Sequence, residues 1–183
     1  MIILITGTNG KSTVVSMLER VLKDIYDKSL ISSGGNIGKP VLELLQDDPV
    51  ISVLEISSFQ LQLTKKIQSD ISLLLNLKED HLDWHKNLDE YHKAKKRVFE
   101  NSDVMLSSDN ILEENSSIIK FSTFLDKYSN FITARIDKVR TEHDKLNIMA
   151  VLTALIYIVS SSSFFLLYTR AFHHQKSTLD FGV

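Results

Sequence analysis

The chain has 183 residues, of which 43% are hydrophobic and 24% are charged, and its formal net charge is -2 at pH 7. This length and composition are typical of one globular domain with a sizeable core, and the small net charge does not favour nucleic-acid binding. Zero cysteines exclude disulfides and thiolate metal sites, and the absence of a signal-peptide pattern or a membrane-spanning apolar run favours a cytoplasmic protein.

The first predicted elements are a strand over 2–5, the loop TGTNGKST over 6–13, and a helix over 12–27. Glycines let backbone N–H groups converge where the helix begins, so a phosphate is the natural ligand of such a loop. Lys11 would reach the β- and γ-phosphates of a nucleotide, and the Ser12 hydroxyl would coordinate Mg²⁺. Ile5 replaces the first glycine of the strict motif, so the loop is a shortened variant. The alternative is a Gly-rich turn with a solvated lysine.

Strands and helices alternate along the rest of the chain. Further strands are predicted over 29–32, 50–56, 71–76, 104–107 and 118–121, and further helices over 39–46, 88–100 and 143–159. This alternation predicts an α/β fold with a mostly parallel sheet and helices on both faces. In such folds ligands bind at the carboxyl ends of the strands.

Polar residues follow two of the predicted strands. Glu55 lies near the carboxyl end of strand 50–56, where it could hold the Mg²⁺ that bridges nucleotide phosphates; the alternative is that it caps the following turn. The strand over 71–76 leads into NLKEDHLD, in which His81 lies among carboxylates. This pattern indicates a metal or substrate site, although a single histidine in a polar loop is more often solvated.

Five blocks of the sequence resemble one family in their order and spacing. They are TGTNGKST, GGNIGKP at 34–40, LEISSFQL at 54–61, NLKEDHLDWH at 76–85 and YHKAKKRVF at 91–99. With these blocks the chain resembles the central, ATP-binding domain of the Mur ligases. Its SSFQL segment is most similar to the branch of the family that adds D-glutamate. The resemblance therefore implies the P-loop fold of the Mur ligase central domain.

The resemblance also implies roles for individual residues. The residues that match the family's ATP loop are Gly7, Thr8, Asn9, Gly10, Lys11, Ser12 and Thr13. Ser12 and Glu55 match one Mg²⁺ site, and His81 and Lys95 match a second. In the family the lysine that matches Lys95 is carbamylated, and a carbamate offers Mg²⁺ oxygen ligands that an ammonium group lacks. Without the resemblance, Lys95 would be interpreted as a solvated lysine in a charged helix.

Other residues match substrate and nucleotide positions of the family. Asn36, Ser57 and Ser58 match residues that face the muramoyl-alanine substrate, although Asn36 is also an ordinary turn residue. The segment TEHDKLN over 141–147 is similar to a family block near the adenine of ATP. Asp144 departs from that block, whereas Asn147 keeps the residue for which the resemblance implies an adenine contact.

The implied reaction is ATP-dependent amide-bond formation in peptidoglycan synthesis. ATP would phosphorylate the carboxylate of UDP-N-acetylmuramoyl-L-alanine, and the amine of D-glutamate would attack the resulting acyl phosphate. The catalytic residues would be Lys11, Glu55, His81 and Lys95. Lys11 and two Mg²⁺ ions would neutralise charge on the transferred phosphoryl group. A monomer is expected.

The resemblance covers residues 1–159 and ends there. Relatives have a UDP-binding domain before this one and an amino-acid-binding domain after it, and both are expected to be absent. An irregular tail is expected over 160–183. His173 and His174 could form a metal-binding pair, but adjacent histidines in such a tail more often have no role. We therefore expect the chain to be inactive alone. The alternatives are a non-catalytic ATP-binding remnant, another Mur-type ligase, and a generic P-loop NTPase that leaves SSFQL and residues 80–95 unexplained.

Overall fold

The computed structural model describes residues 1–36, 38–46, 48–80, 83–111, 115–123 and 141–160. Its strands form one sheet in the order β2-β3-β1-β4-β5-β6, and all neighbouring strands run parallel. The strands are β1 (Ile2–Thr6), β2 (Ile31–Gly35), β3 (Ile51–Glu55), β4 (Ser69–Leu74), β5 (Ser102–Ser107) and β6 (Ile118–Lys120). This architecture confirms the predicted α/β class. Of the tail expected over 160–183, only Ser160 is described, and it ends a helix.

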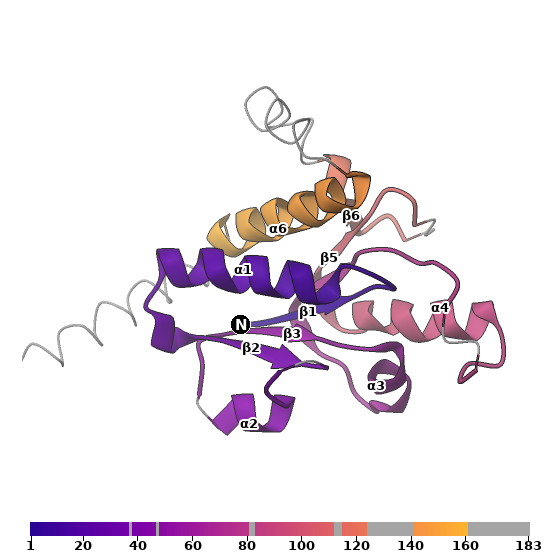
Figure 1. The fold of residues 1–183 in the computed structure, drawn as a ribbon, viewed down its shortest axis with the longest axis horizontal. Coiled ribbons are helices and arrows are strands. Elements are labelled where there is room, and N and C mark those ends of the chain that lie inside the picture. The colour runs from indigo at the N-terminus through magenta and orange to yellow at the C-terminus, as the bar shows by residue number, and fades with distance from the viewer. Residues whose placement is uncertain (37, 47, 81–82, 112–114, 124–140, 161–183) are drawn as a thin grey trace, which may run out of the picture.

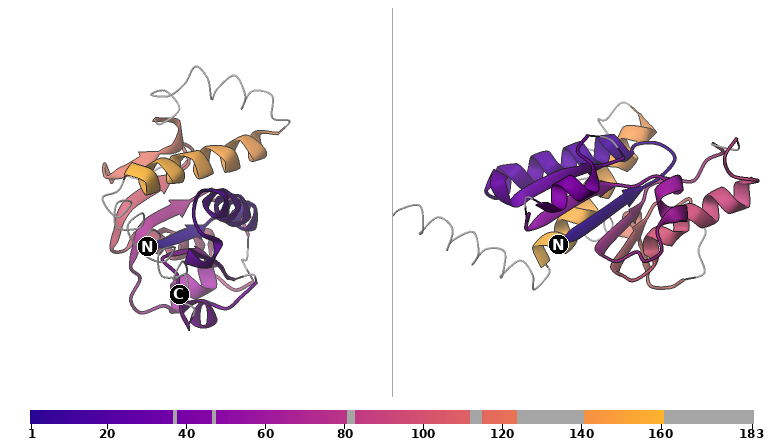
Figure 2. Two further views of the ribbon diagram at one scale, coloured as in Figure 1. Left: turned by 90° about the vertical axis from the view of Figure 1, so that its left-hand side faces the viewer. Right: turned by 90° about the horizontal axis from the view of Figure 1, so that it is seen from below.

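Helices cover both faces of the sheet (Figures 1 and 2). One face carries α1 (Lys11–Ile25) and α6 (Glu142–Ser160), which pack side by side. The opposite side carries α2 (Val41–Gln46), α3 (Ser58–Leu63) and α4 (Leu88–Lys96). Two short 3-10 helices, η1 (Lys28–Leu30) and η2 (Arg97–Phe99), follow α1 and α4. The helix expected over 88–100 is therefore α4 followed by η2.

Alternating side chains of β1 divide the core into two layers. Ile3 and Ile5 pack on the side of α1 and α6, whereas Leu4 packs on the side of α3. All three side chains are buried, and full burial of such a side chain contributes about 1.5–3 kcal/mol. Because β1 is anchored on both faces and lies between β3 and β4, the loop that follows it starts from a fixed point.

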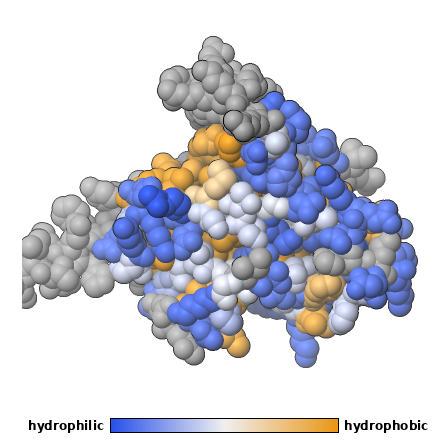
Figure 3. Space-filling view, viewed as in Figure 1, coloured by the Kyte–Doolittle hydropathy of each residue, from blue (hydrophilic) through white to orange (hydrophobic). Residues whose placement is uncertain are grey.

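Helix α6 is the one helix in the described part of the chain that is long and apolar enough to cross a membrane, by length and composition alone. Its residues Ala150, Ala154 and Ile158 are buried in the core between α1 and the sheet. In the space-filling view, apolar residues gather over α6, while most of the same face is hydrophilic (Figure 3). One side of α6 thus lies in the core, whereas other apolar residues of the helix, such as Val159, lie at the surface.

Two segments differ from the sequence-based expectation. The strand expected over 29–32 is η1 followed by β2, because the Asp27 side chain accepts a hydrogen bond from Ser29 N (2.9 Å) and holds a 3-10 turn. β2 then continues through Gly35, since pairing with β3 overrides the poor strand propensity of glycine. Helix α3 was missed, although the Ser-x-x-Gln capping box at Ser57 marks its beginning.

Candidate active site

The loop between β1 and α1 lies at the carboxyl edge of the sheet, where the strand order changes direction. Gly10 caps the start of α1 with φ 85°, in the left-handed region that favours glycine. The first N–H groups of α1 and its partial positive charge therefore lie at this edge. Lys11 Nζ donates to the backbone carbonyls of Gly7 (3.0 Å) and Thr8 (2.9 Å). Helix beginnings of this kind are suited to bind anions.

Residues after β4 hold this loop in place. The Thr8 and Asn9 backbone N–H groups donate to the carbonyl (3.1 Å) and the side-chain oxygen (2.9 Å) of Asn76. Asn76 Nδ2 donates in return to the Asn9 carbonyl (3.0 Å), and Lys78 N donates to Thr8 Oγ1 (3.0 Å). Sequence analysis assigned no role to Asn76. Its position, two residues after a strand that neighbours the loop strand, was the signal that could have identified it.

The structure brings Ser12 and Glu55 together. Parallel pairing of β1 with β3 places Glu55 opposite Ile5, next to the start of α1. Ser12 Oγ donates to Glu55 Oε2 at 2.7 Å, and the Glu55 residue is 2% exposed. Asn36 Nδ2 donates to the other carboxylate oxygen, Oε1, at 3.2 Å. The Glu55 side chain thus contacts both neighbouring loops, and a role in capping the following turn does not account for these contacts.

The pair of Ser12 and Glu55 has the donor atoms that suit Mg²⁺. Hydroxyl and carboxylate oxygens are ligands that this ion prefers, and it is usually held by one or two carboxylates together with nucleotide phosphates. Over the described ranges no group of three or more His, Cys, Asp or Glu side chains could hold a metal ion by itself. The pair therefore suits a metal ion that arrives with a phosphate. His81, expected in a second metal site, lies outside the described residues.

Lys95 is buried at the same loop, in contrast to the solvated alternative. It is 2% exposed, its Nζ donates to the Gly7 carbonyl at 2.8 Å, and Nζ lies 4.8 Å from the centroid of the Tyr91 ring. Burial, reinforced by the positive charge of Lys11, lowers the pKa of Lys95 to about 7, although two nearby carboxylates oppose this shift. A large share of this amine is therefore uncharged near neutral pH.

Tyr91 is a site residue that sequence analysis missed. It is fully buried, and its hydroxyl lies 3.1 Å from Thr8 Oγ1. Burial raises the pKa of the Tyr91 phenol. Tyr91 precedes Lys95 by one helical turn, and residues at i and i+4 share a helix face. The spacing in YHKAKKRVF could therefore have identified Tyr91 once Lys95 was assigned to the site.

The two serines of the SSFQL segment differ in their surroundings. Ser57 Oγ accepts a hydrogen bond from Gln60 N (3.2 Å), and Gln60 Oε1 accepts one from Ser57 N (2.8 Å), so Ser57 caps α3. Ser58 is 1% exposed, and its Oγ lies 3.0 Å from Nε2 of the buried His85. The His85 ring in turn packs against Tyr91. Substrate contact stays a prediction for Ser57, Ser58 and the exposed Asn36.

Two cavities open beside the loop. The smaller one, of about 170 Å³, adjoins Ser12 and Glu55. The larger one, of about 310 Å³, lies among the segments after β4 and β5 and the start of α6. Its lining includes Asn76, Lys78, Ser108, Asp109, Asn110 and His143. Polar groups line both cavities, and the second is large enough for a small-molecule ring system.

The adenine contact implied for Asn147 stays a prediction. Asn147 is 1% exposed and lies against the loop, since a Cβ added at Gly10 would be 2.4 Å from Asn147 Oδ1. Its Nδ2 lies 3.3 Å from Nδ1 of His143, which does line the larger cavity. Asp144, the departure from the family block, instead accepts a hydrogen bond from the Thr141 hydroxyl. Thr13 is exposed on α1.

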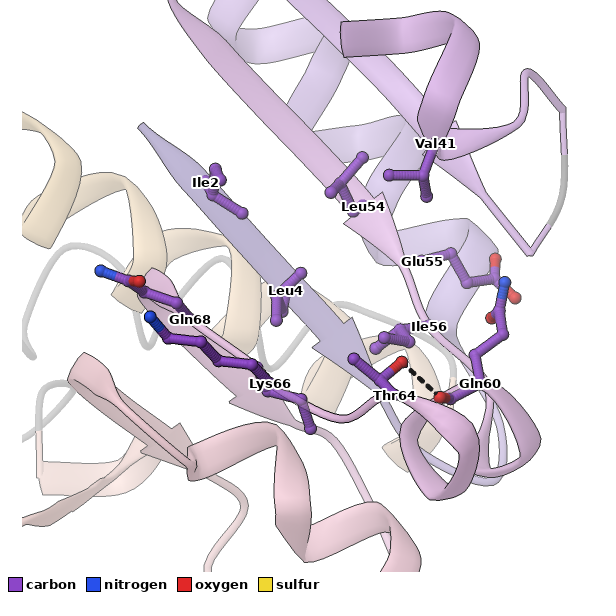
Figure 4. A pocket seen from close by; sticks show the side chains of 11 residues that line it. Ile2, Leu4, Val41, Leu54, Glu55, Ile56, Gln60, Thr64, Lys66 and Gln68 are labelled. Atoms are coloured by element: carbon purple, nitrogen blue, oxygen red, sulfur yellow. Dashed lines mark hydrogen bonds between the residues drawn. The ribbon is translucent and has the colours of Figure 1, made fainter.

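A third cavity, of about 300 Å³, lies on the opposite face of the sheet. Ile2, Leu4 and Leu54 point into it, and Glu55 and Gln60 lie at one end (Figure 4). Its lining is mostly apolar and offers few partners for a phosphate. The charged groups that suit an anion converge instead at the loop after β1.

A parallel sheet with a phosphate-type loop after its central strand defines an α/β P-loop domain. The family model for the Mur ligase middle domain matches residues 5–158, and the chain belongs to this family. The match confirms the resemblance that the five sequence blocks indicated.

Curated relatives and a solved structure agree with this assignment. The chain is 35% identical over 167 residues to the UDP-N-acetylmuramoylalanine–D-glutamate ligase of Caldicellulosiruptor saccharolyticus, covering 78% of this chain and 36% of the relative. It is 44% identical over 99 residues to the enzyme of the same name from Acinetobacter baylyi, covering 54% and 22%. The fold is similar to that of MurF ligase from Thermotoga maritima in complex with ADP, with TM-score 0.55 and 16% identity, covering 88% of this chain and 46% of that one. The chain thus covers less than half the length of each of these proteins.

Proposed function

We propose that this chain is the ATP-binding part of a ligase that joins D-glutamate to UDP-N-acetylmuramoyl-L-alanine in peptidoglycan synthesis. The observation that carries the proposal is the hydrogen bond between Ser12 and Glu55 at the start of α1. This pair lies in a domain of the Mur ligase family, and curated relatives of the chain are D-glutamate ligases. The carboxyl group of the muramoyl-alanine substrate would accept the γ-phosphoryl group of ATP, and the D-glutamate amine would then displace phosphate.

The loop residues have distinct tasks in this proposal. The N–H groups at the start of α1 would bind the phosphates of ATP, and Lys11 would move from the Gly7 and Thr8 carbonyls to the β- and γ-phosphates. Ser12 and Glu55 would hold Mg²⁺, which supplies positive charge against the transferred phosphoryl group when bound. The larger cavity beside His143 would accept the base or ribose of the nucleotide.

Lys95 has a separate role in the proposal. A neutral amine can add CO₂ and release one N–H proton to solvent, which forms a carbamate anion, whereas an ammonium ion has no lone pair for this step. The lowered pKa of Lys95 supports such a reaction near neutral pH. The product would replace a positive group beside the Gly7 carbonyl by a negative one with oxygen atoms that suit a second Mg²⁺.

The test is the affinity of the 183-residue chain for ATP and Mg²⁺, measured by calorimetry. Replacing Lys11 by Ala removes a charged hydrogen-bond donor worth about 1.5–3 kcal/mol, so Kd should rise roughly 10- to 150-fold. Arg20→Ala is the matched control, because Arg20 lies on the exposed face of the same helix and carries the same charge. Equal affinities for the two variants would show that the loop does not bind the phosphates.

Because the chain spans about a third of the Caldicellulosiruptor relative, we expect it to bind nucleotide by itself without forming the D-glutamyl product. Incubation with ATP, muramoyl-alanine substrate and D-glutamate, followed by chromatography, checks this expectation. Product above the level of the Lys11→Ala variant would contradict it.

A further inference from the structure

The carboxylate of Glu55 is oriented from two sides. Ser12 Oγ donates to Oε2 at 2.7 Å, and Asn36 Nδ2 donates to Oε1 at 3.2 Å. Glu55 is 2% exposed, so its carboxylate depends on these neighbours rather than on bulk water for its partners. A metal ion that binds Oε2 beside Ser12 would leave the bond from Asn36 to Oε1 intact.

The turn after β2 is shaped to hold Asn36 at this point. Gly35 has φ 113°, and a Cβ added there would lie 2.2 Å from the Glu55 carbonyl oxygen. This close approach lets Asn36 N donate to the Glu55 carbonyl at 2.9 Å, while Gly35 N donates to the Lys39 carbonyl at 2.9 Å and closes the turn. Asn36 therefore contacts both the backbone and the side chain of Glu55.

From this geometry we propose that Asn36 is a positioning residue for Glu55, which fixes the carboxylate in the orientation that binds Mg²⁺ together with the nucleotide. The inference rests on the proposed function, and it gives Asn36 a role in addition to substrate contact. Groups that hydrogen-bond to a metal-binding carboxylate orient it and raise metal affinity. The amide suits this task because it donates without charge: a lysine would compete with the metal ion, and an aspartate would repel the carboxylate.

The experiment uses Mn²⁺ as the probe, because it takes the same oxygen ligands as Mg²⁺ and its free concentration can be read by electron paramagnetic resonance. Mn²⁺ is titrated into the 183-residue chain in the presence of a non-hydrolysable ATP analogue. Asn36→Ala should raise the Kd for Mn²⁺ about 10- to 100-fold. The affinity for the analogue in EDTA should stay unchanged, because Asn36 acts through the metal-binding carboxylate. Gln68→Ala is the control, because Gln68 is exposed and lies just before β4, at the edge of the sheet opposite to Glu55. It should match the wild type in both measurements.

The possible outcomes distinguish the inference about Asn36 from the proposed function. Equal Mn²⁺ affinities for Asn36→Ala and Gln68→Ala would overturn the inference and leave the proposed function standing. Loss of analogue binding in EDTA by Asn36→Ala would also overturn it, since the effect would not be specific to the metal. Failure of the wild-type chain to bind the analogue with or without Mn²⁺ would refute the proposed function itself. Circular dichroism on both variants confirms that they fold.

Discussion

The effect of pH on the free energy of unfolding tests the electrostatics of Lys95 at the loop. The pKa of Lys95 falls from an ordinary value of 10.5 to about 7 in the folded chain, chiefly because the group is buried. Below pH 7 the folded and unfolded chains both hold the proton, and the full cost of burying the charge is present. Between pH 7 and 10.5 the unfolded chain keeps the proton that the folded chain releases. The free energy of unfolding therefore rises with pH in this window.

Replacing Lys95 by Met removes this pH-dependent contribution to the free energy of unfolding. One pH unit within the window corresponds to about 1.4 kcal/mol. From about pH 7.5 to about pH 9.5 the wild-type chain should thus gain on the order of 2–3 kcal/mol relative to Lys95→Met. Urea unfolding in CO₂-free buffer measures the difference, with Lys93→Met as the control because Lys93 is exposed on the same helix. If all three chains show the same dependence on pH, the buried amine does not lose its proton within this pH range.

Three substitutions test how the loops around Glu55 are built, all by urea unfolding. Gly35→Ala should destabilise the chain by about 1–3 kcal/mol, because the new Cβ would meet the Glu55 carbonyl. Gly38→Ala should cost only the backbone strain of about 1–2 kcal/mol, since nothing lies within 4 Å of its added Cβ; a larger loss there than at Gly35 would contradict the packing argument. Ser57→Ala should cost about 1 kcal/mol through the lost helix cap, and an unchanged midpoint would show that the capping box contributes nothing.

The parts of the fold that could be predicted are those that short sequence patterns specify. The apolar run before TGTNGKST predicts a buried strand, and the glycines predict the turn into α1. Glu55 was expected near the loop because parallel strands end at one edge of a sheet, and the structure places it 2.7 Å from Ser12 Oγ. The hydrophobic pattern did not predict the full extent of β2, because its glycines are compatible with both a turn and a strand. The glycines of β2 indicate a turn when considered alone, and only pairing with β3 makes Gly34 and Gly35 part of a strand.

The surroundings of Lys95 could not be predicted from local sequence. The run His-Lys-Ala-Lys-Lys-Arg has the composition of a solvated helix face, and only the family resemblance assigned Lys95 to the site. Its partner, the Gly7 carbonyl, is 88 residues away in the chain. Burial of Lys95 follows from the packing of α4 against the loop after β1, which no short-range pattern specifies. The role of Asn76 likewise depends on a bond to Asn9 across 67 residues.

The two lysines at the loop connect its electrostatics to its proposed chemistry. Lys11 and Lys95 both donate to the Gly7 carbonyl, at 3.0 Å and 2.8 Å. Two ammonium groups on one oxygen repel each other, and this repulsion is the second cause of the lowered pKa of Lys95. A phosphate would relieve the repulsion by drawing Lys11 away, and addition of CO₂ to Lys95 would turn it into attraction. Both events change the interaction between Lys11 and Lys95, so we expect carbamate formation and nucleotide binding to be thermodynamically coupled at this site.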